Sequence, residues 1–308
     1  MRLVDDGYKN TGARQRYAEV YDRAWALSPP PDVVHDIATE FGNVRVYRHG
    51  PEHGVPIVLI HGFFLTSAMW WAQVEELRGD FTTYAMDMLG QPGASLQRKK
   101  MSTPADAART IDAVLEGLDL HGVHLVGHSY GGWLATHTTA YLPGRLASLT
   151  LVDPAPTVVR LSTRFWRSLA LLLSTPRSEP ARRAAAWVTG HPAPGTPVDL
   201  LTKLFVAGFD SFAAPLNTPP LRFCGNRLLR SIDVPVQVLL AGNSVHDSRS
   251  AIRRSNGRAF LAASAVAQRF TLVAGRRASR CQRVSSWVHD EALTLGLTRR
   301  PGCSLRYI

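Results

Sequence analysis

Short apolar runs alternate with helix-compatible stretches along the first half of the chain. Runs such as Val55–Ile60 have no polar alternation, which is typical of strands covered by helices on both faces. The pattern predicts an edge strand at Asn43–Tyr47 and further strands at Val55–Ile60, Thr82–Met86, His121–Val126, Leu149–Val152 and Val236–Leu240. Between them it predicts helices at Trp70–Leu77, Ala105–Leu118 and Trp133–Tyr141. This alternation indicates the α/β class, with a mostly parallel sheet and crossover helices.

The pattern changes in two places outside this core. Residues 1–42 have apolar positions at helical spacing and reach three consecutive prolines, so we expect a helical leader. Between 154 and 229 the strand rhythm stops, and apolar helix-compatible segments alternate with proline-rich breaks. That stretch is too long for a loop and predicts an inserted helical cap. The core itself is expected in residues 43–153 and 230–254.

The last part of the chain differs in composition from everything before it. From 255 to 308 arginine, serine and alanine dominate, and two of the three cysteines lie here. No carboxyl-terminal amphipathic helix of the expected kind is recognisable, so we expect this Arg-rich tail to be poorly packed. One hypothesis is that a GC-rich gene is read out of frame after Arg254, which would leave the chain without its last strand and final helix.

Charge and cysteine usage limit the partners. The formal net charge is +11, but residues 251–308 hold eleven arginines against two acids, which leaves +2 for residues 1–250. With no basic stripe in the fold, we expect no nucleic-acid partner. The longest apolar run, Leu169–Leu173, is far below the roughly 20 residues that span a bilayer, so stable membrane insertion is not expected. An odd cysteine count and no signal-like start favour the cytoplasm.

The strongest chemical signal is the run Gly127-His128-Ser129-Tyr130-Gly131-Gly132. It follows a predicted strand and precedes a predicted helix. A strand that reverses into a helix within so few residues needs glycines on both sides of the central residue. Ser129 would then stand at a helix amino terminus, where developing negative charge is favoured, and it is the candidate nucleophile. The alternative is a simple tight turn. His128 is assigned no chemistry.

A second turn supplies candidate oxyanion donors. His61-Gly62-Phe63-Phe64 directly follows the buried strand that ends at Ile60. In an acyl-transfer site, the backbone N–H groups of Phe63 and Tyr130 would hold the tetrahedral oxyanion. His61 is expected to make structural hydrogen bonds. An ordinary strand-to-loop turn is the alternative.

These stretches resemble the α/β-hydrolase superfamily, and in particular its serine carboxylesterase-like members with a helical leader. The matching runs are 58–62, 87–95, the segment around Ser129, 151–154 and 234–242, in the family's order. The resemblance implies an eight-stranded, mostly parallel sheet flanked by helices, a cap over the pocket, and hydrolysis through an acyl-enzyme. Members with an aspartate nucleophile are disfavoured because serine stands at position 129.

The resemblance also implies an acid and then a histidine after the serine. The acid is expected after the strand that ends near Gly242, where Asp247 is the carboxylate; it could instead cap a helix that begins at Ser248. Asp153 is the alternative acid. The predicted last strand, Arg269–Gly275, is followed by arginines, which cannot act as a base. His289 is the remaining candidate base, and a helix-surface position is the alternative for it.

The sequence therefore predicts a cofactor-free serine hydrolase that cleaves a small or medium carboxylic ester. We expect Phe63, Phe64, Tyr130, Phe165 and Trp166 to line its pocket, with core packing as the alternative for the cap residues. Thioester, lactone or amide hydrolysis and perhydrolysis use the same serine and stay open. So does a hydrolase-like protein that binds a small ligand without turnover. The oligomeric state is not specified.

Overall fold

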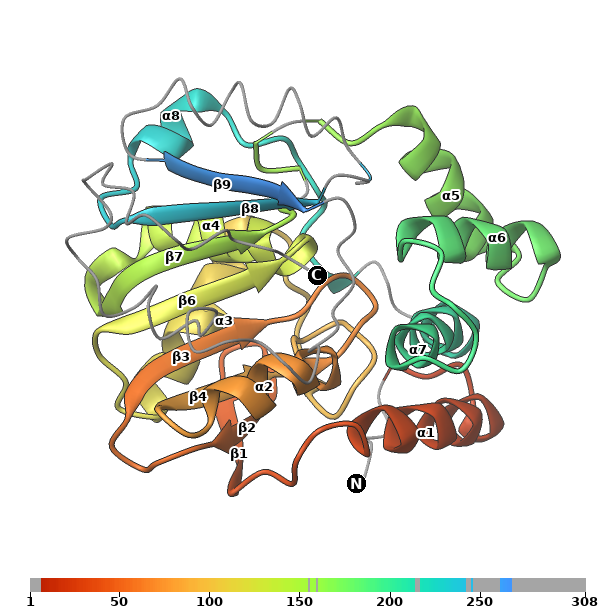
Figure 1. Cartoon of the computed structure of the whole chain (residues 1–308), viewed down its shortest axis with the longest axis horizontal. Coiled ribbons are helices and arrows are strands. Elements are labelled where there is room, and N and C mark those ends of the chain that lie inside the picture. The colour runs from red at the N-terminus through yellow and green to blue at the C-terminus, as the bar shows by residue number, and fades with distance from the viewer. Residues whose placement is uncertain are drawn as a thin grey trace, which may run out of the picture.

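A computed structural model describes residues 7–154, 156–158, 160–213, 217–241 and 245, and the backbone of 261–267. Its centre is a sheet whose main path runs β1-β2-β4-β3-β6-β7-β8-β9, with β5 beside β2 (Figure 1). The strands are β1 Val33–Thr39, β2 Gly42–His49, β3 Val55–Ile60, β4 Phe81–Met86, β5 Leu96–Gln97, β6 Val123–His128, β7 Leu146–Val152, β8 Val236–Ala241 and β9 Leu261–Ala267. From β4 to β9 all neighbours are parallel, whereas β2 pairs antiparallel with β1, β4 and β5. The predicted mostly parallel α/β sheet is confirmed.

Helices cover both faces of this sheet. The α-helices are α1 Thr11–Trp25, α2 Trp71–Leu77, α3 Pro104–Gly117, α4 Tyr130–Tyr141, α5 Thr163–Ser174, α6 Glu179–Val188, α7 Pro197–Ser211 and α8 Asn226–Arg230, and short 3₁₀ turns lie at Ser67–Trp70 and Pro143–Arg145. Along β3, Val58 and Ile60 belong to the core under α3 and α4. Ile57 and Leu59 belong to the core under α1 and α2. Burial on both faces explains why this strand reads as an unbroken apolar run.

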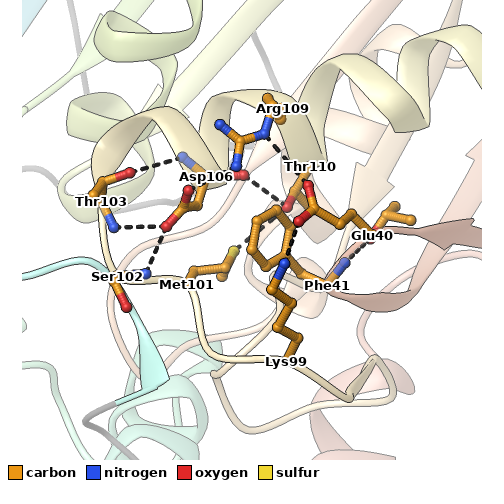
Figure 2. A network of polar contacts seen from close by, with 10 residues as sticks. Glu40, Phe41, Lys99, Met101, Ser102, Thr103, Asp106, Arg109 and Thr110 are labelled. Atoms are coloured by element: carbon orange, nitrogen blue, oxygen red, sulfur yellow. Dashed lines mark hydrogen bonds and ion pairs between the residues drawn. The ribbon is translucent and has the colours of Figure 1, made fainter.

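The start of α3 is fixed by polar contacts that also hold the β1–β2 hairpin (Figure 2). Thr103 caps the helix, and the Asp106 carboxylate accepts hydrogen bonds from the backbone N–H groups of Ser102 and Thr103 at 2.7 and 2.9 Å. This is a capping box, which satisfies two donors that the helix leaves unpaired. Glu40, at the hairpin turn, forms ion pairs with Lys99 and with Arg109 of α3. The edge of the sheet is therefore joined to the helix layer.

The amino-terminal segment is only partly helical, so the predicted helical leader over 1–42 is wrong in its second half. Helix α1 forms as expected, but residues 33–39 are strand β1, which pairs with β2 around the turn at 40–41. The expected edge strand at 43–47 is thus the second strand. The run Val33–Thr39 alternates between half-buried and exposed residues, which is the pattern of a one-sided edge strand.

The leader helix is attached to the core through a buried carboxylate, Asp87. The Tyr21 hydroxyl of α1 donates to Asp87 Oδ2 at 3.0 Å, and it lies 3.0 Å from the Tyr47 hydroxyl. Asp87 also accepts from the Ser67 N–H and hydroxyl and from the Ala94 N–H. Burial, reinforced by Asp87, raises the pKa of Tyr21 well above its usual range, so the phenol keeps the proton that it donates. One carboxylate therefore joins α1 to the loops after β3 and β4.

Three helices between β7 and β8 lie beyond the carboxyl ends of the strands (Figure 1). They are α5, α6 and α7, and α7 packs alongside α1. The shorter α8 follows them in the chain and packs on α4 instead. None of the helices in the described residues is long and apolar enough to cross a membrane.

The last described strand, β9, pairs parallel with β8 at 261–267. Its sequence, Leu-Ala-Ala-Ser-Ala-Val-Ala, is rich in alanine, which strands disfavour, so no strand was expected there. Its pairing with β8 contradicts the expectation that residues beyond 255 are poorly packed. The predicted strand at 269–275 lies outside the described residues.

The junction between β6 and α4 is crowded at its glycines. A Cβ atom added to Gly127 would lie 2.4 Å from the carbonyl oxygen of Gly131, and one added to Gly131 would lie 2.4 Å from that of Ile60. Both contacts are with backbone, which cannot swing aside. The first turn of α4 therefore rests directly on β6 and β3, and only glycine permits that approach.

Replacing Tyr21 by phenylalanine should destabilise the protein by about 1.5–3 kcal/mol, because the change removes a hydrogen bond to a buried charged group. Urea unfolding measures the loss. Tyr141→Phe is the matched control, since that side chain is 45% exposed, and its effect should stay within about 0.5 kcal/mol. Equal effects of the two substitutions would contradict the importance of the Asp87 contacts.

Gly127→Ala should lower the free energy of unfolding by about 3 kcal/mol, because the added methyl group overlaps a carbonyl oxygen. Gly79→Ala is the control, as a Cβ there meets nothing within 4 Å. That change should be neutral or stabilising by up to about 1 kcal/mol, through a less flexible unfolded chain. Urea titrations should therefore show a lower unfolding midpoint for Gly127→Ala and an unchanged or higher midpoint for Gly79→Ala. A well-tolerated Gly127→Ala would show that the junction can relax.

Candidate active site

A cavity of about 430 Å³ lies between the carboxyl ends of the strands and the helices α5 to α7. The core contributes Gly62, Phe63, Leu65, Met69, His128, Ser129, Tyr130, Asp153, Leu221, Ala241 and Val245 to its wall. The other side is formed by Phe165, Leu169, Leu172, Trp187, Val188, Thr189, Gly190, His191, Val198, Leu201 and Phe205. Most of the lining is apolar; His128, Ser129 and Asp153 lie at the strand ends, and Thr189 and His191 lie on the other side. Such a cavity suits a small apolar ligand with one reactive group.

Ser129 stands between β6 and α4 in a strained backbone conformation. Its φ is 50° and its ψ is −113°, values that residues other than glycine rarely adopt. Its N–H donates to the Val152 carbonyl at 2.9 Å, and its own carbonyl accepts the first helical bond, from Trp133, at 3.1 Å. These bonds hold the strained residue at the amino terminus of α4, where the helix dipole favours negative charge.

The turn after β3 brings Phe63 into the cavity wall, where Tyr130 at the start of α4 also lies. Their rings meet edge to face with centroids 5.5 Å apart. The next residue, Phe64, donates its N–H to Gln91 Oε1 at 2.7 Å, which fixes the turn. The residues predicted to supply oxyanion donors are therefore brought to the same cavity as Ser129.

His61 makes structural hydrogen bonds, as expected. The Met88 N–H donates to its Nε2 at 2.9 Å, so the ring proton is on Nδ1, which lies 2.8 Å from the Gly62 carbonyl. Burial lowers the pKa of His61, with Asp87 partly opposing the shift. The neutral ring joins the loop after β3 to the loop after β4.

His128 and Asp153 lie beside Ser129. Burial lowers the pKa of His128 to about 4; the nearby Asp153 carboxylate opposes this shift and His61 adds to it. Asp153 follows β7 with a φ of 47°, its N–H donates to Leu239, and its Oδ1 accepts the Ala241 N–H at 3.3 Å. The alternative acid is thus in the cavity wall, whereas Asp247 and His289 lie outside the described residues.

Two of the predicted pocket residues lie elsewhere. Trp166 follows Phe165 by about 100° around α5 and is 47% exposed, so Phe165 faces the cavity and Trp166 faces solvent. Phe64 is fully buried behind the wall, where it stacks on Phe209 at 4.1 Å. The expectations for Trp166 and Phe64 are wrong because neighbouring residues on a helix or a tight turn point in different directions.

Sequence reasoning missed two cavity residues at the end of α6. Trp187 lines the cavity, and the Arg164 guanidinium lies 4.2 Å from the centre of its ring. His191, with a φ of 53°, lines it from the following turn. The available signal was their place in the predicted cap, just before one of its proline-rich breaks. Within the described part of the chain, no three His, Cys, Asp or Glu side chains gather as a metal site.

Comparisons with known proteins agree with this architecture. The sequence profile of the alpha/beta hydrolase fold matches residues 55–188. Carboxylesterase YbfK of Bacillus subtilis is 28% identical over 230 residues, 73% of this chain and 76% of that protein. Carboxylesterase nap of the same organism, described as uncharacterized, is 27% identical over 248 residues, 78% of this chain and 81% of its own.

A solved structure extends the likeness to nearly the whole chain. The crystal structure of naproxen esterase (carboxylesterase NP) from Bacillus subtilis has a TM-score of 0.75 at 24% identity, and the match covers 95% of this chain and 99% of that one. At 24% identity this structure shows the fold alone. The sequence matches add a similarity to two carboxylesterases. The chain therefore has the α/β-hydrolase fold, and its sequence is similar to two carboxylesterases.

Proposed function

We propose that this protein hydrolyses small or medium carboxylic esters through an acyl-enzyme formed on Ser129. The observation that carries the proposal is the position of Ser129, held at a φ of 50° at the start of α4 in the wall of an apolar cavity. A strained serine at a strand-to-helix turn is the arrangement that exposes a nucleophile. The likeness to two carboxylesterases supports the ester as the bond that is cleaved.

The reaction would proceed in two halves. The Ser129 hydroxyl attacks the ester carbonyl carbon while a histidine accepts its proton, and the N–H groups of Phe63 and Tyr130 hold the resulting oxyanion. Collapse of this tetrahedral species breaks the bond to the alcohol, which leaves with the proton from the histidine. Water then attacks the acyl carbon with the same histidine as base, and the carboxylic acid and free Ser129 are released.

We propose Asp247 as the acid and His289 as the base, from their order after the serine, with Asp153 as the alternative acid. Support for Asp153 comes from its place in the cavity wall beside His128. His128 itself is a poor candidate base, because a group whose pKa lies near 4 binds the serine proton weakly at neutral pH.

Helices α5, α6 and α7 would act as the cap of this cavity and select the ester. Phe165, Leu169 and Leu172 of α5 and Trp187 of α6 supply apolar area opposite Ser129. Such a wall favours an apolar acyl or alcohol group over a charged one. We also propose a cytoplasmic location, because an odd cysteine count suits a reducing compartment.

Wild-type protein should hydrolyse short-chain p-nitrophenyl esters, and Ser129→Ala should lower kcat/KM by at least about 10³-fold, because the nucleophile is lost. Ser231→Ala, at an exposed serine of the α8 end, is the matched control and should change nothing. A serine-directed fluorophosphonate should label the wild type and leave Ser129→Ala unlabelled. If wild type and Ser129→Ala both fail to hydrolyse the esters, the result would contradict the proposed esterase activity and favour a binding protein.

The acid and the base can be assigned separately by substitution. Asp247→Asn should lower kcat/KM by about 10³- to 10⁴-fold, because an amide does not hold the histidine in the required tautomer. His289→Ala should be as damaging as Ser129→Ala, and Asp153→Asn should cost less than about tenfold. Steady-state kinetics on one ester measures all three. A severe loss in Asp153→Asn with an active Asp247→Asn would move the acid to Asp153, and an active His289→Ala would exclude that base.

A further inference from the structure

Helix α5 is apolar on two sides, although only one side faces the cavity. Phe165, Leu169 and Leu172 line the cavity. On the exposed half of the helix, Trp166 and Leu173 lie on one flank and are 47% and 48% exposed, and Leu171, 37% exposed, lies on the other flank, about 150° further around. In the described part of the chain these are three of five exposed large hydrophobic residues, and the other two, Val34 and Tyr141, lie on separate elements. A concentration of exposed apolar side chains on one helix marks an interaction surface.

The same part of the cap is strongly basic. Residues 160–191 contain six arginines and one acid, Glu179, which gives a formal charge of +5. Since residues 1–250 sum to +2, the rest of that stretch is at −3. Arg182 and Arg183 share Glu179, and Arg177 pairs with Asp210 of α7. Arg164, which lies over the Trp187 ring, and Arg167 belong to the same helix as the exposed apolar residues.

We propose that the outer face of α5, with the arginines of α5 and α6, adsorbs the protein to an anionic lipid surface. Tryptophan and leucine side chains enter the boundary between headgroups and acyl chains, and arginines bind the lipid phosphates. At 12 residues, α5 is too short to span a bilayer and would lie in the plane of the interface. Binding itself does not depend on the proposed esterase activity.

Charge favours an anionic lipid surface over two other partners that could cover the exposed side of α5. A second copy of the chain would bring one basic face against another, and like charges repel. The carboxyl-terminal segment 251–308 carries +9 in its sequence, so it is also repelled from a surface at +5. An anionic surface satisfies both the arginines and the apolar side chains. Because Phe165 and Leu169 line the cavity from the same helix, lipid adsorption would place the cavity beside membrane-dissolved esters.

The test is co-sedimentation of the full-length protein with vesicles of phosphatidylcholine, with and without phosphatidylglycerol. We expect binding to the vesicles that contain phosphatidylglycerol and much weaker binding to pure phosphatidylcholine. The triple variant Trp166→Ser, Leu171→Ser, Leu173→Ser should bind the anionic vesicles at least about tenfold more weakly, because it loses the inserted apolar area. The double variant Val34→Ser, Tyr141→Ser removes similarly exposed residues elsewhere and should bind like wild type.

Two further readouts keep the result unambiguous. Thermal unfolding of the triple variant should match that of wild type, since its three residues are exposed. Quenching of tryptophan fluorescence by brominated phospholipid should fall in Trp166→Phe, which places α5 at the interface. Equal vesicle binding by wild type and the triple variant would overturn the proposal and assign binding to the Arg-rich tail. Absence of binding, or equal binding to both kinds of vesicle, would also overturn it.

Discussion

The first turn of α4 can approach β6 and β3 only because its contact residues lack side chains. Gly127, Gly131 and Gly132 each meet backbone atoms at distances where a Cβ would overlap. This approach sets the direction of α4, and with it the position of Ser129 at the helix start. The strained backbone of Ser129 is then held by its bonds to Val152 and Trp133. The candidate nucleophile is therefore positioned by close packing of the main chain, with the side chain free to face the cavity.

Buried polar groups hold the loops that surround this serine. A buried carboxylate is tolerated only when its oxygens accept hydrogen bonds, and Asp87 accepts them from Tyr21, Ser67 and Ala94. His61 accepts from Met88, and Gln91 accepts from Phe64. These bonds tie the turn that carries Phe63 to the loop after β4 and, through Tyr21, to helix α1. The amino-terminal helix thus supports the candidate oxyanion turn, although it contributes nothing to the cavity wall.

The sheet and the serine were predictable because their signals are local. An unbroken apolar run such as Val55–Ile60 predicts a buried strand by itself, and the glycines around Ser129 imply the close approach that the structure shows. The sequence does not predict strand β1, because the helical leader is expected to extend to residue 42, beyond the three prolines at 29–31. Strand β9 was missed because an alanine-rich segment pairs here through its backbone, which sequence does not report. Phe64 and Trp166 were wrongly predicted to line the pocket. The backbone turns between neighbouring residues, so a residue next to a pocket residue in sequence can point in another direction.

The net charge summed over 1–250 does not show how unevenly the charge is distributed along the chain. A charge of +2 over 250 residues suggests a neutral protein, yet it combines residues 160–191 at +5 with a remainder at −3. The apolar residues of α5 are likewise ambiguous in sequence, because a run such as Leu169–Leu173 reads as core. Once the helix is in place, its seven-residue spacing separates Phe165 and Leu172, which face the cavity, from Trp166 and Leu173, which face solvent. One helix can then serve two purposes, since its cavity side selects a substrate and its outer side remains available to a surface that supplies one.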